Sequence, residues 1–394
     1  MGVDQSLRVV GLFAGIGGIE LGLRSAGHRP VLFSEIDSAA RTVLEDQLAE
    51  IPLHPDITTL ESLPDCDLVT AGFPCQDLSQ AGRTAGITGS QSGLVEHVFR
   101  LLDSANPAPK WLLLENVSFM LSLDRGRAMT WLVDQLELRG YTWAYRVVDS
   151  QAFGLPQRRQ RVLLLASQTE DPRPVLLNQS ESQNLAEDHG GELACGFYWT
   201  EGLRGLGWAI DGVPTLKGGS SIGIPSPPAI WIPGSGRLVT PDIRDAERLQ
   251  GFEADWTAST KTSGGSRRGD RWRWKLVGNA VSVPVTRWLG ERLRSPEAQF
   301  DQPDAELNGK RWPRAAWGGS GERREVAVSM WPVTWDRPHL LDHLEYEPQF
   351  LSARATAGFL DRAGRGNLRI PEDFLREAHW HLKSMTMQPQ LVAA

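Results

Sequence analysis

The stretch Leu7-Arg8-Val9-Val10-Gly11-Leu12-Phe13-Ala14-Gly15-Ile16-Gly17-Gly18 decides the fold of this chain. Its first half predicts an apolar strand over Leu7–Phe13, and a helix is expected to follow from Gly17 to Ala26. Glycines adopt positive φ angles and let a backbone approach a ligand closely. The free N–H groups at the start of the helix also favour an anion. The stretch therefore predicts a strand, a ligand-binding turn and a helix, although a tight turn that binds nothing is the simpler alternative.

The alternation of apolar strands and amphipathic helices continues to residue 166, which predicts a doubly wound, mainly parallel α/β sheet. Ligands of such a sheet bind at the carboxyl ends of its strands. Gly15, Glu35, Cys75 and Glu115 all fall at the carboxyl ends of predicted strands, so we expect them to share one crevice. The further strands are expected at Pro30–Ser34, Asp67–Ala71, Trp111–Glu115, Tyr141–Val148 and Arg161–Ala166, and the helices at Ala39–Ala49, Leu94–Ala105 and Ala128–Arg139.

The pattern changes after Ser167, where polar loops and segments rich in glycine, serine and proline predict short strands and turns. Helical patterns return at Asp242–Gln250 and Val285–Leu293. The last hundred residues carry five tryptophans, which are too apolar for a disordered tail. We therefore expect an α/β domain over 1–166, a region of short strands and turns after it, and an ordered C-terminal extension over 295–394.

The composition indicates a soluble protein of several domains, with 394 residues and no apolar run near the roughly 20 residues that span a bilayer. Three cysteines and no signal peptide predict a reducing cytoplasm, and we expect no metal site. A net charge of −7 argues against a nucleic-acid binder, but basic residues gather at 158–161 and 267–275. Either basic cluster could also be a solvated face.

Cys75 lies in Gly72-Phe73-Pro74-Cys75-Gln76, between a strand and a long polar loop, a position that favours a nucleophile over a buried small hydrophobe. Glu115 ends an apolar strand, where a carboxyl group tends to act as an acid. Arg159 and Arg161 alternate, so their side chains are expected on one side, where guanidinium groups bind carbonyl or phosphate oxygens. Glu35 suits a ribose diol, so the glycine turn and Glu35 alone leave a dinucleotide dehydrogenase possible.

Together these residues resemble the DNA (cytosine-5) methyltransferases, and the resemblance extends in the family's motif order from Leu7 to about Leu293. Two positions depart from the pattern: Glu253 stands where proline usually follows Gly-Phe, and Ser282 stands where proline is frequent. Both departures affect the packing of elements that brace the recognition region, and neither falls on a predicted catalytic residue. The matching motifs are Phe13–Gly18, Glu35, Asp56 in Pro55-Asp56-Ile57-Thr58, Gly72–Gln76, Glu115-Asn116-Val117, Gln157-Arg158-Arg159-Gln160-Arg161, Thr215-Leu216, Arg237–Phe252 and Gly278-Asn279-Ala280-Val281.

The resemblance implies methyl transfer from S-adenosylmethionine to C5 of a flipped-out cytosine, with S-adenosylhomocysteine as product and no metal. It also implies double-stranded DNA as partner, a monomer, and a bacterial or phage restriction-modification or protection setting with a separately encoded endonuclease. It makes 1–166, completed by 274–294, the catalytic domain and 167–273 a β-rich target-recognition domain. It assigns catalysis to Cys75, Glu115, Arg159 and Arg161. It assigns the cofactor to Phe13, Ala14, Gly15, Ile16, Gly17, Gly18, Glu35, Ile36, Asp56, Ile57, Pro74, Asn279 and Val281, and DNA to Gln76, Ser79, Gln157, Thr215 and Arg237.

Two alternatives stay open: an RNA cytosine methyltransferase of the same architecture, and a DNA-binding regulatory module without catalysis. The intact Cys75, Glu115 and Arg161 argue against the second alternative. A dehydrogenase would leave Cys75 and the later motifs unexplained.

Overall fold

The computed structural model describes residues 6–74, 93–183, 191–218, 227–263, 266–295, 299–309 and 311–387, without the side chains of 261–270. Cys75, Gln76 and Ser79 lie outside the described residues. The chain forms two compact units. Unit 1 comprises Met1–Phe153, Gln160–Gln183 and Ala280–Trp335, and unit 2 comprises Gly154–Arg159, Asn184–Asn279 and Asp336–Ala394.

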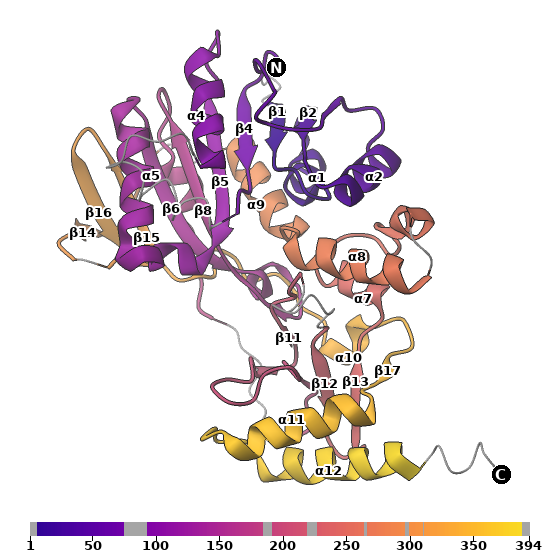
Figure 1. Cartoon of the computed structure of the whole chain (residues 1–394). Coiled ribbons are helices and arrows are strands. Elements are labelled where there is room, and N and C mark those ends of the chain that lie inside the picture. Colours follow the sequence, from indigo (N-terminus) through magenta and orange to yellow (C-terminus); the bar gives the residue numbers. More distant parts are fainter. Residues whose placement is uncertain are drawn as a thin grey trace. The chain divides into compact units, whose positions relative to one another are not determined.

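Unit 1 is built on a ten-stranded sheet with the order β14-β16-β15-β6-β8-β5-β4-β1-β2-β3 (Figure 1). Strands β1 to β5 pair in parallel, whereas β8, β6 and the remaining strands pair antiparallel. The strands are β1 (Arg8–Leu12), β2 (Arg29–Ser34), β3 (Leu53–His54), β4 (Leu68–Ala71), β5 (Trp111–Val117), β6 (Thr142–Asp149), β8 (Gln160–Ser167), β14 (Asp304–Glu306), β15 (Ala315–Gly319) and β16 (Glu322–Val326).

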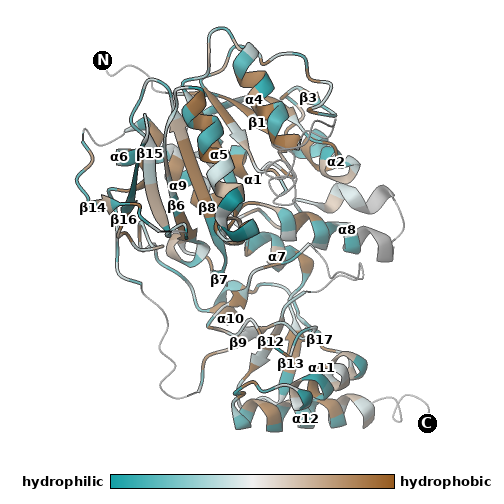
Figure 2. Ribbon diagram, turned by 60° about the vertical axis from the view of Figure 1, so that its left-hand side comes forward, coloured by the Kyte–Doolittle hydropathy of each residue, from teal (hydrophilic) through white to brown (hydrophobic). Residues whose placement is uncertain are grey.

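Helices lie on both faces of this sheet, with α4 and α5 on one face and α1, α6 and α9 on the other (Figure 1). The central strands are coloured hydrophobic, and the helices beside them alternate between hydrophilic and hydrophobic residues (Figure 2). The expected doubly wound α/β fold is therefore confirmed. The helices of unit 1 are α1 (Gly18–Ser25), α2 (Ser38–Gln47), α4 (Leu94–Ser104), α5 (Arg127–Leu138), α6 (Arg173–Leu176) and α9 (Val283–Arg294), with 3-10 turns η1 (Ser118–Leu121), η2 (Leu123–Gly126) and η3 (Ser150–Phe153).

Unit 2 contains a five-stranded antiparallel sheet with the order β10-β9-β12-β13-β17, and a short parallel pair of β11 with β7. Its strands are β7 (Gln157–Arg158), β9 (Cys195–Phe197), β10 (Ala209–Ile210), β11 (Val213–Pro214), β12 (Ala229–Ile232), β13 (Arg237–Thr240) and β17 (Gln349–Phe350). Its helices are α7 (Ile243–Arg248), α8 (Ser266–Asn279), α10 (Leu340–His343), α11 (Ala353–Arg365) and α12 (Glu372–Met387), with the 3-10 turn η4 (Ala258–Ser263).

Successive residues of strand β12 supply two different cores, because side chains alternate between the faces of a sheet. Trp231 packs on one face with Phe359 of α11 and Phe374 of α12. Ile230 packs on the other face with Leu249, which follows α7, and with α8. Helices α11 and α12 therefore cover one face of the sheet of unit 2.

The C-terminal region, which we expected as one extension over 295–394, is divided between the two units. Residues 299–335 contribute strands β14, β15 and β16 to the large sheet, and residues after Trp335 contribute β17 and three helices to unit 2. Its tryptophans are used as core residues: Trp331 is 2% exposed, and the Trp312 ring contacts Trp143 and Tyr145. Among the described helices, none has the length and apolar character needed to cross a bilayer.

Candidate active site

The carboxylate of Glu35 joins the glycine turn after β1 to the end of β2. One carboxylate oxygen, Oε2, accepts a hydrogen bond from the Gly15 N–H at 2.7 Å, and the other accepts one from the Asp37 N–H at 2.7 Å. Burial raises the pKa of Glu35, while these main-chain hydrogen bonds oppose the shift. The predicted acid, Glu35, is therefore hydrogen-bonded to the predicted glycine turn.

The turn leaves open space at Gly15, whose φ is +57° and where an added Cβ would meet no atom within 4 Å. Phe13 also adopts a positive φ of 56°, and its ring lies 6.5 Å from the ring of Phe73. Ile36 is 66% exposed beside Glu35. An open glycine, an anchored acid and an exposed apolar side chain fit a nucleoside that carries a hydroxyl pair. Of the other predicted cofactor residues in the turn, Ala14 is half-buried and Ile16, Gly17 and Gly18 are buried.

Asp56 follows β3 and accepts a hydrogen bond from the Thr58 N–H at 2.9 Å. This main-chain bond lowers the pKa of Asp56, so the side chain is a stable carboxylate at the same edge of the sheet. Ile57 is buried in the core of unit 1. The carboxylate of Asp56 is thus able to accept a hydrogen bond from a ligand, whereas Ile57 is a core residue.

The segment Gly72–Pro74, which leads from β4 to Cys75, is held against the end of β5. The side-chain amide of Asn116 donates to the Phe73 carbonyl at 3.0 Å. A Cβ at Gly72 would lie 3.5 Å from Glu115 Oε2, so the backbone passes close to that carboxylate. Pro74 is exposed at the end of the segment.

Glu115 and Arg161 form an ion pair, with 3.0 Å between Arg161 Nε and Glu115 Oε1. In the antiparallel pair of β5 and β8, Val117 lies opposite Arg161. Glu115 is therefore a diagonal neighbour of Arg161 on the same face. The side chains are 9% and 11% exposed, so the pair is mostly buried but reaches solvent. Two of the four predicted catalytic residues are thus in contact.

Arg159 and Gln157 belong to unit 2, where both are buried. Arg159 donates to the carbonyls of Leu216 and Gly278, at 3.0 and 3.2 Å. Gln157 donates to the Leu249 carbonyl at 2.7 Å and accepts from the Leu216 N–H at 3.0 Å. Both residues tie together distant segments of unit 2, and contact of Gln157 with DNA would require these bonds to break.

The other predicted DNA contacts among the described residues, Thr215 and Arg237, are at least partly exposed in unit 2. Thr215 is half-buried and its hydroxyl donates to the Arg158 carbonyl at 2.9 Å. Arg237 is exposed, and its guanidinium carbon lies 5.6 Å from the centre of the Phe350 ring. Arg273, which the sequence placed in a basic cluster, is fully buried and pairs with Glu247 at 2.9 Å.

The last predicted motif crosses the boundary between the units. Asn279 ends α8 in unit 2, whereas Val281 packs against the core of unit 1. Helix α9 then packs on α1, and the Thr286 hydroxyl donates to the Gly18 carbonyl at 3.2 Å. The motif thus returns the chain to the helix that follows the glycine turn.

Sequence reasoning missed Glu20, a carboxyl group that is buried behind the glycine turn. Its Oε1 accepts a hydrogen bond from the Thr70 hydroxyl at 2.6 Å, and a Cβ at Gly11 would lie 2.5 Å from it. Burial raises the pKa of Glu20 to about 7. An acid in the first turn of a helix is ordinarily exposed, and the only sequence signal was its place among apolar residues of α1.

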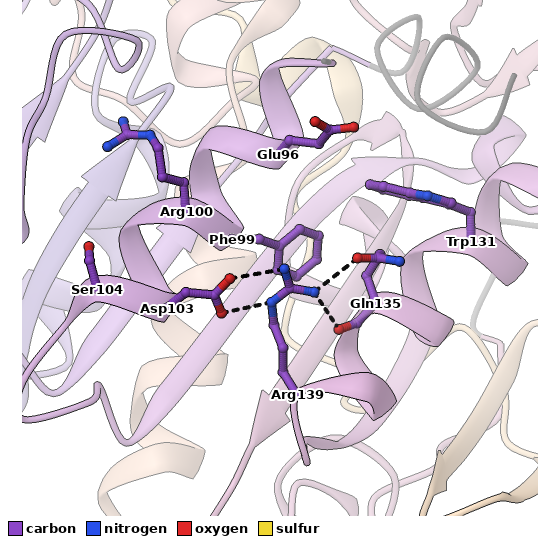
Figure 3. A pocket seen from close by; sticks show the side chains of 8 residues that line it. All are labelled: Glu96, Phe99, Arg100, Asp103, Ser104, Trp131, Gln135 and Arg139. Atoms are coloured by element: carbon purple, nitrogen blue, oxygen red, sulfur yellow. Dashed lines mark hydrogen bonds and ion pairs between the residues drawn. The ribbon is translucent and has the colours of Figure 1, made fainter. Parts of the chain in front are cut away.

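A groove between α4 and α5 lies apart from these residues (Figure 3). Its most prominent cation, Arg139, is already bound to Asp103 and Gln135 and stacks on Phe99. The guanidinium of Arg139 therefore already has partners within the groove.

Comparisons with known proteins identify the family of this chain. The family of C-5 cytosine-specific DNA methylases matches residues 7–193. The chain is 49% identical to the type II methyltransferase M2.BsuMI of Bacillus subtilis (strain 168), over 94% of this chain and 96% of that protein. The chain belongs to the C-5 cytosine-specific DNA methylase family. The resemblance inferred from the motifs is therefore confirmed, and with it a family of methyltransferases that depend on S-adenosylmethionine.

Two further matches have lower sequence identity. The type II methyltransferase M.NgoBI of Neisseria gonorrhoeae is 31% identical over 71% of this chain and 90% of its own length. Among solved structures, the S. pombe Dnmt2 methyltransferase matches with a TM-score of 0.52 and 19% identity, over 73% of this chain and 98% of that chain. At this identity the structural similarity concerns the fold alone.

Proposed function

We propose that this chain methylates C5 of a cytosine flipped out of duplex DNA, through a covalent bond between the Cys75 sulfur and C6, in a type II restriction-modification setting. The observation that carries the proposal is the Glu115–Arg161 pair beside Gly72–Pro74, which leads to Cys75. Family membership supports the same reaction class.

Glu35, Asp56 and the open turn at Gly15 would hold S-adenosylmethionine, with Ile36 against its adenine. When bound, this cofactor supplies an electrophilic methyl group. Its product would be S-adenosylhomocysteine. No metal is needed for this chemistry.

Cys75 would donate an electron pair to C6 of the flipped base, forming the S–C6 bond. Glu115 would donate a proton to N3, so that electron density collects at C5, which takes the methyl group. Removal of the C5 proton by a base then returns the S–C6 electron pair to the thiolate, and N3 returns its proton to Glu115. Arg161 would orient Glu115 through the ion pair and would assist at the base oxygen.

Unit 2 would read the sequence from the major groove, where all four base pairs differ. Thr215 and Arg237 are its predicted contacts, together with Gln157 if its internal bonds open. Arg159 would act by holding Leu216 and Gly278 in place. We expect a monomer that works beside a separately encoded endonuclease.

Bisulfite sequencing of DNA from cells that express the chain tests the function and also identifies the modified site. We expect methylated cytosines at one short sequence, and none in cells expressing Cys75→Ser. Undiminished methylation by Cys75→Ser would exclude the covalent scheme. If the protein methylated tRNA but not duplex DNA in vitro, its substrate would be RNA and the proposed DNA substrate would be wrong.

A further inference from the structure

The turn that joins β5 to α5, residues 118–127, begins three residues after Glu115; we call it the edge turn. Met120 anchors it in the core at 1% exposure, and Leu121 and Leu123 pack against the same core. Phe119 is 60% exposed instead. The edge turn therefore presents an aromatic ring to solvent close to the predicted catalytic carboxylate.

The backbone of the edge turn adopts a disfavoured conformation. Asp124 and Arg125 are adjacent non-glycine residues in the left-handed region, with φ of 51° and 59°, and Gly126 follows with φ of 88°. Such strain persists where the surrounding structure imposes it, and it gathers at functional sites. Here the Gly126 carbonyl accepts a hydrogen bond from the indole N–H of Trp312 at 3.1 Å. A residue of the C-terminal region thus supports the base of the turn.

The strained backbone presents two arginines to solvent. Arg125 is exposed and has no side-chain partner among the residues that the structure describes. The Arg127 side chain is 70% exposed and is oriented by Asp124, with 2.6 Å between Nη2 and Oδ1. The edge turn therefore carries one more positive than negative charge in a chain of net charge −7.

We propose that the edge turn binds the sugar-phosphate backbone of duplex DNA next to the target nucleotide, with Arg125 and Arg127 on phosphates and Phe119 against a sugar. Guanidinium forks match phosphate oxygens, and half to two-thirds of protein–DNA hydrogen bonds go to the backbone. The inference rests on the proposed function, because it needs DNA as the substrate. It assigns the edge turn a positioning role without sequence preference.

The test measures the affinity for a mixed-sequence duplex as a function of salt, by fluorescence anisotropy with full-length protein. Each phosphate contact contributes a slope of about −0.9 to log K against log salt. Arg125→Asn, which tolerates the left-handed backbone, and Arg127→Ala should each make the slope shallower by about 1, and the double variant by about 2. Phe119→Ala should weaken binding at every salt concentration without changing the slope.

Arg287→Ala is the matched control, because Arg287 is also an exposed arginine of unit 1 paired along a helix, with Glu291 at 2.9 Å. It should keep the wild-type slope, and Arg125→Lys should recover it. S-adenosylmethionine binding by each variant reports an intact unit 1. Wild-type slopes in the arginine variants, or an equal loss in Arg287→Ala, would overturn the inference while leaving the proposed function intact. A wild-type protein that binds no DNA would overturn both.

Discussion

The two units each contain a buried glutamate–arginine pair, and the pairs differ in what surrounds them. Glu115 and Arg161 of unit 1 are 9% and 11% exposed and lie beside a glycine at the end of a strand. Glu247 and Arg273 of unit 2 are 0% and 1% exposed, and the same glutamate accepts a hydrogen bond from the Thr257 N–H at 3.0 Å. In the proposed function, a residue of the first pair exchanges its partner for a ligand. The second cannot do so without leaving a buried charge alone.

Glu115→Gln tests whether the pair in unit 1 is catalytic or structural. If Glu115 transfers a proton to the base, the variant should lose about 10²–10⁴-fold in kcat. Its free energy of unfolding should change little, because the amide still accepts from Arg161. Single-turnover methylation and urea unfolding measure the two quantities, and a large loss of stability with normal turnover would make this pair structural.

Arg273→Met is the counterpart in unit 2. Removing one partner of a fully buried pair should destabilise the protein by about 3–5 kcal/mol, because the Glu247 charge stays buried. Urea unfolding measures this, and methylation per folded molecule should remain near wild type. Arg287→Met is the control, since an exposed i,i+4 pair contributes only about 0.3–0.5 kcal/mol. Equal stability of the two variants would contradict the comparison.

Glu20 differs from both glutamates of these pairs, because it is a buried acid without a cationic partner among the described residues. Because burial raises its pKa from 4.5 to about 7, the folded state holds a proton that the unfolded chain releases. The stability due to this proton is present below about pH 4.5 and is lost as the pH rises through 7, by about 3 kcal/mol. Glu20→Gln should remove this decline in chemical unfolding measured from pH 4.5 to 8. The exposed Glu45→Gln should keep it, and a Glu20→Gln profile that still declines as in wild type would refute the assignment.

Gln157→Leu tests whether Gln157 stabilises unit 2 or contacts DNA. It leaves the Leu249 carbonyl and the Leu216 N–H without their buried partner, so we expect a loss of about 1–3 kcal/mol in stability. Gln168→Leu, at an exposed amide, should change stability by less than about 0.5 kcal/mol. A Gln157 variant of normal stability that binds DNA weakly would instead support the predicted DNA contact.

Local sequence patterns predicted many strands and helices of unit 1, because each of these elements buries an apolar face in one continuous core. The glycine turn, the acid that follows β2 and the acid near the end of β5 could be located by their strands alone, although β5 continues to Val117, two residues beyond the predicted end. The geometry that brings Glu35 to Gly15 follows from the parallel pairing of β1 with β2. Such short-range regularity is what periodicity and turn chemistry encode.

By itself the sequence determined the doubly wound sheet, the family and the candidate residues at the strand ends, since these depend on local periodicity and on motifs of fixed spacing. Only the tertiary structure decided that Arg161 pairs with Glu115 while Arg159 and Gln157 hold unit 2 together, that Glu20 is buried, and that the tryptophan-rich C-terminal region is divided between two cores. The physical reason is that burial and partner choice depend on residues far apart in the chain. The local pattern of polar and apolar residues does not identify which distant residue each side chain will contact.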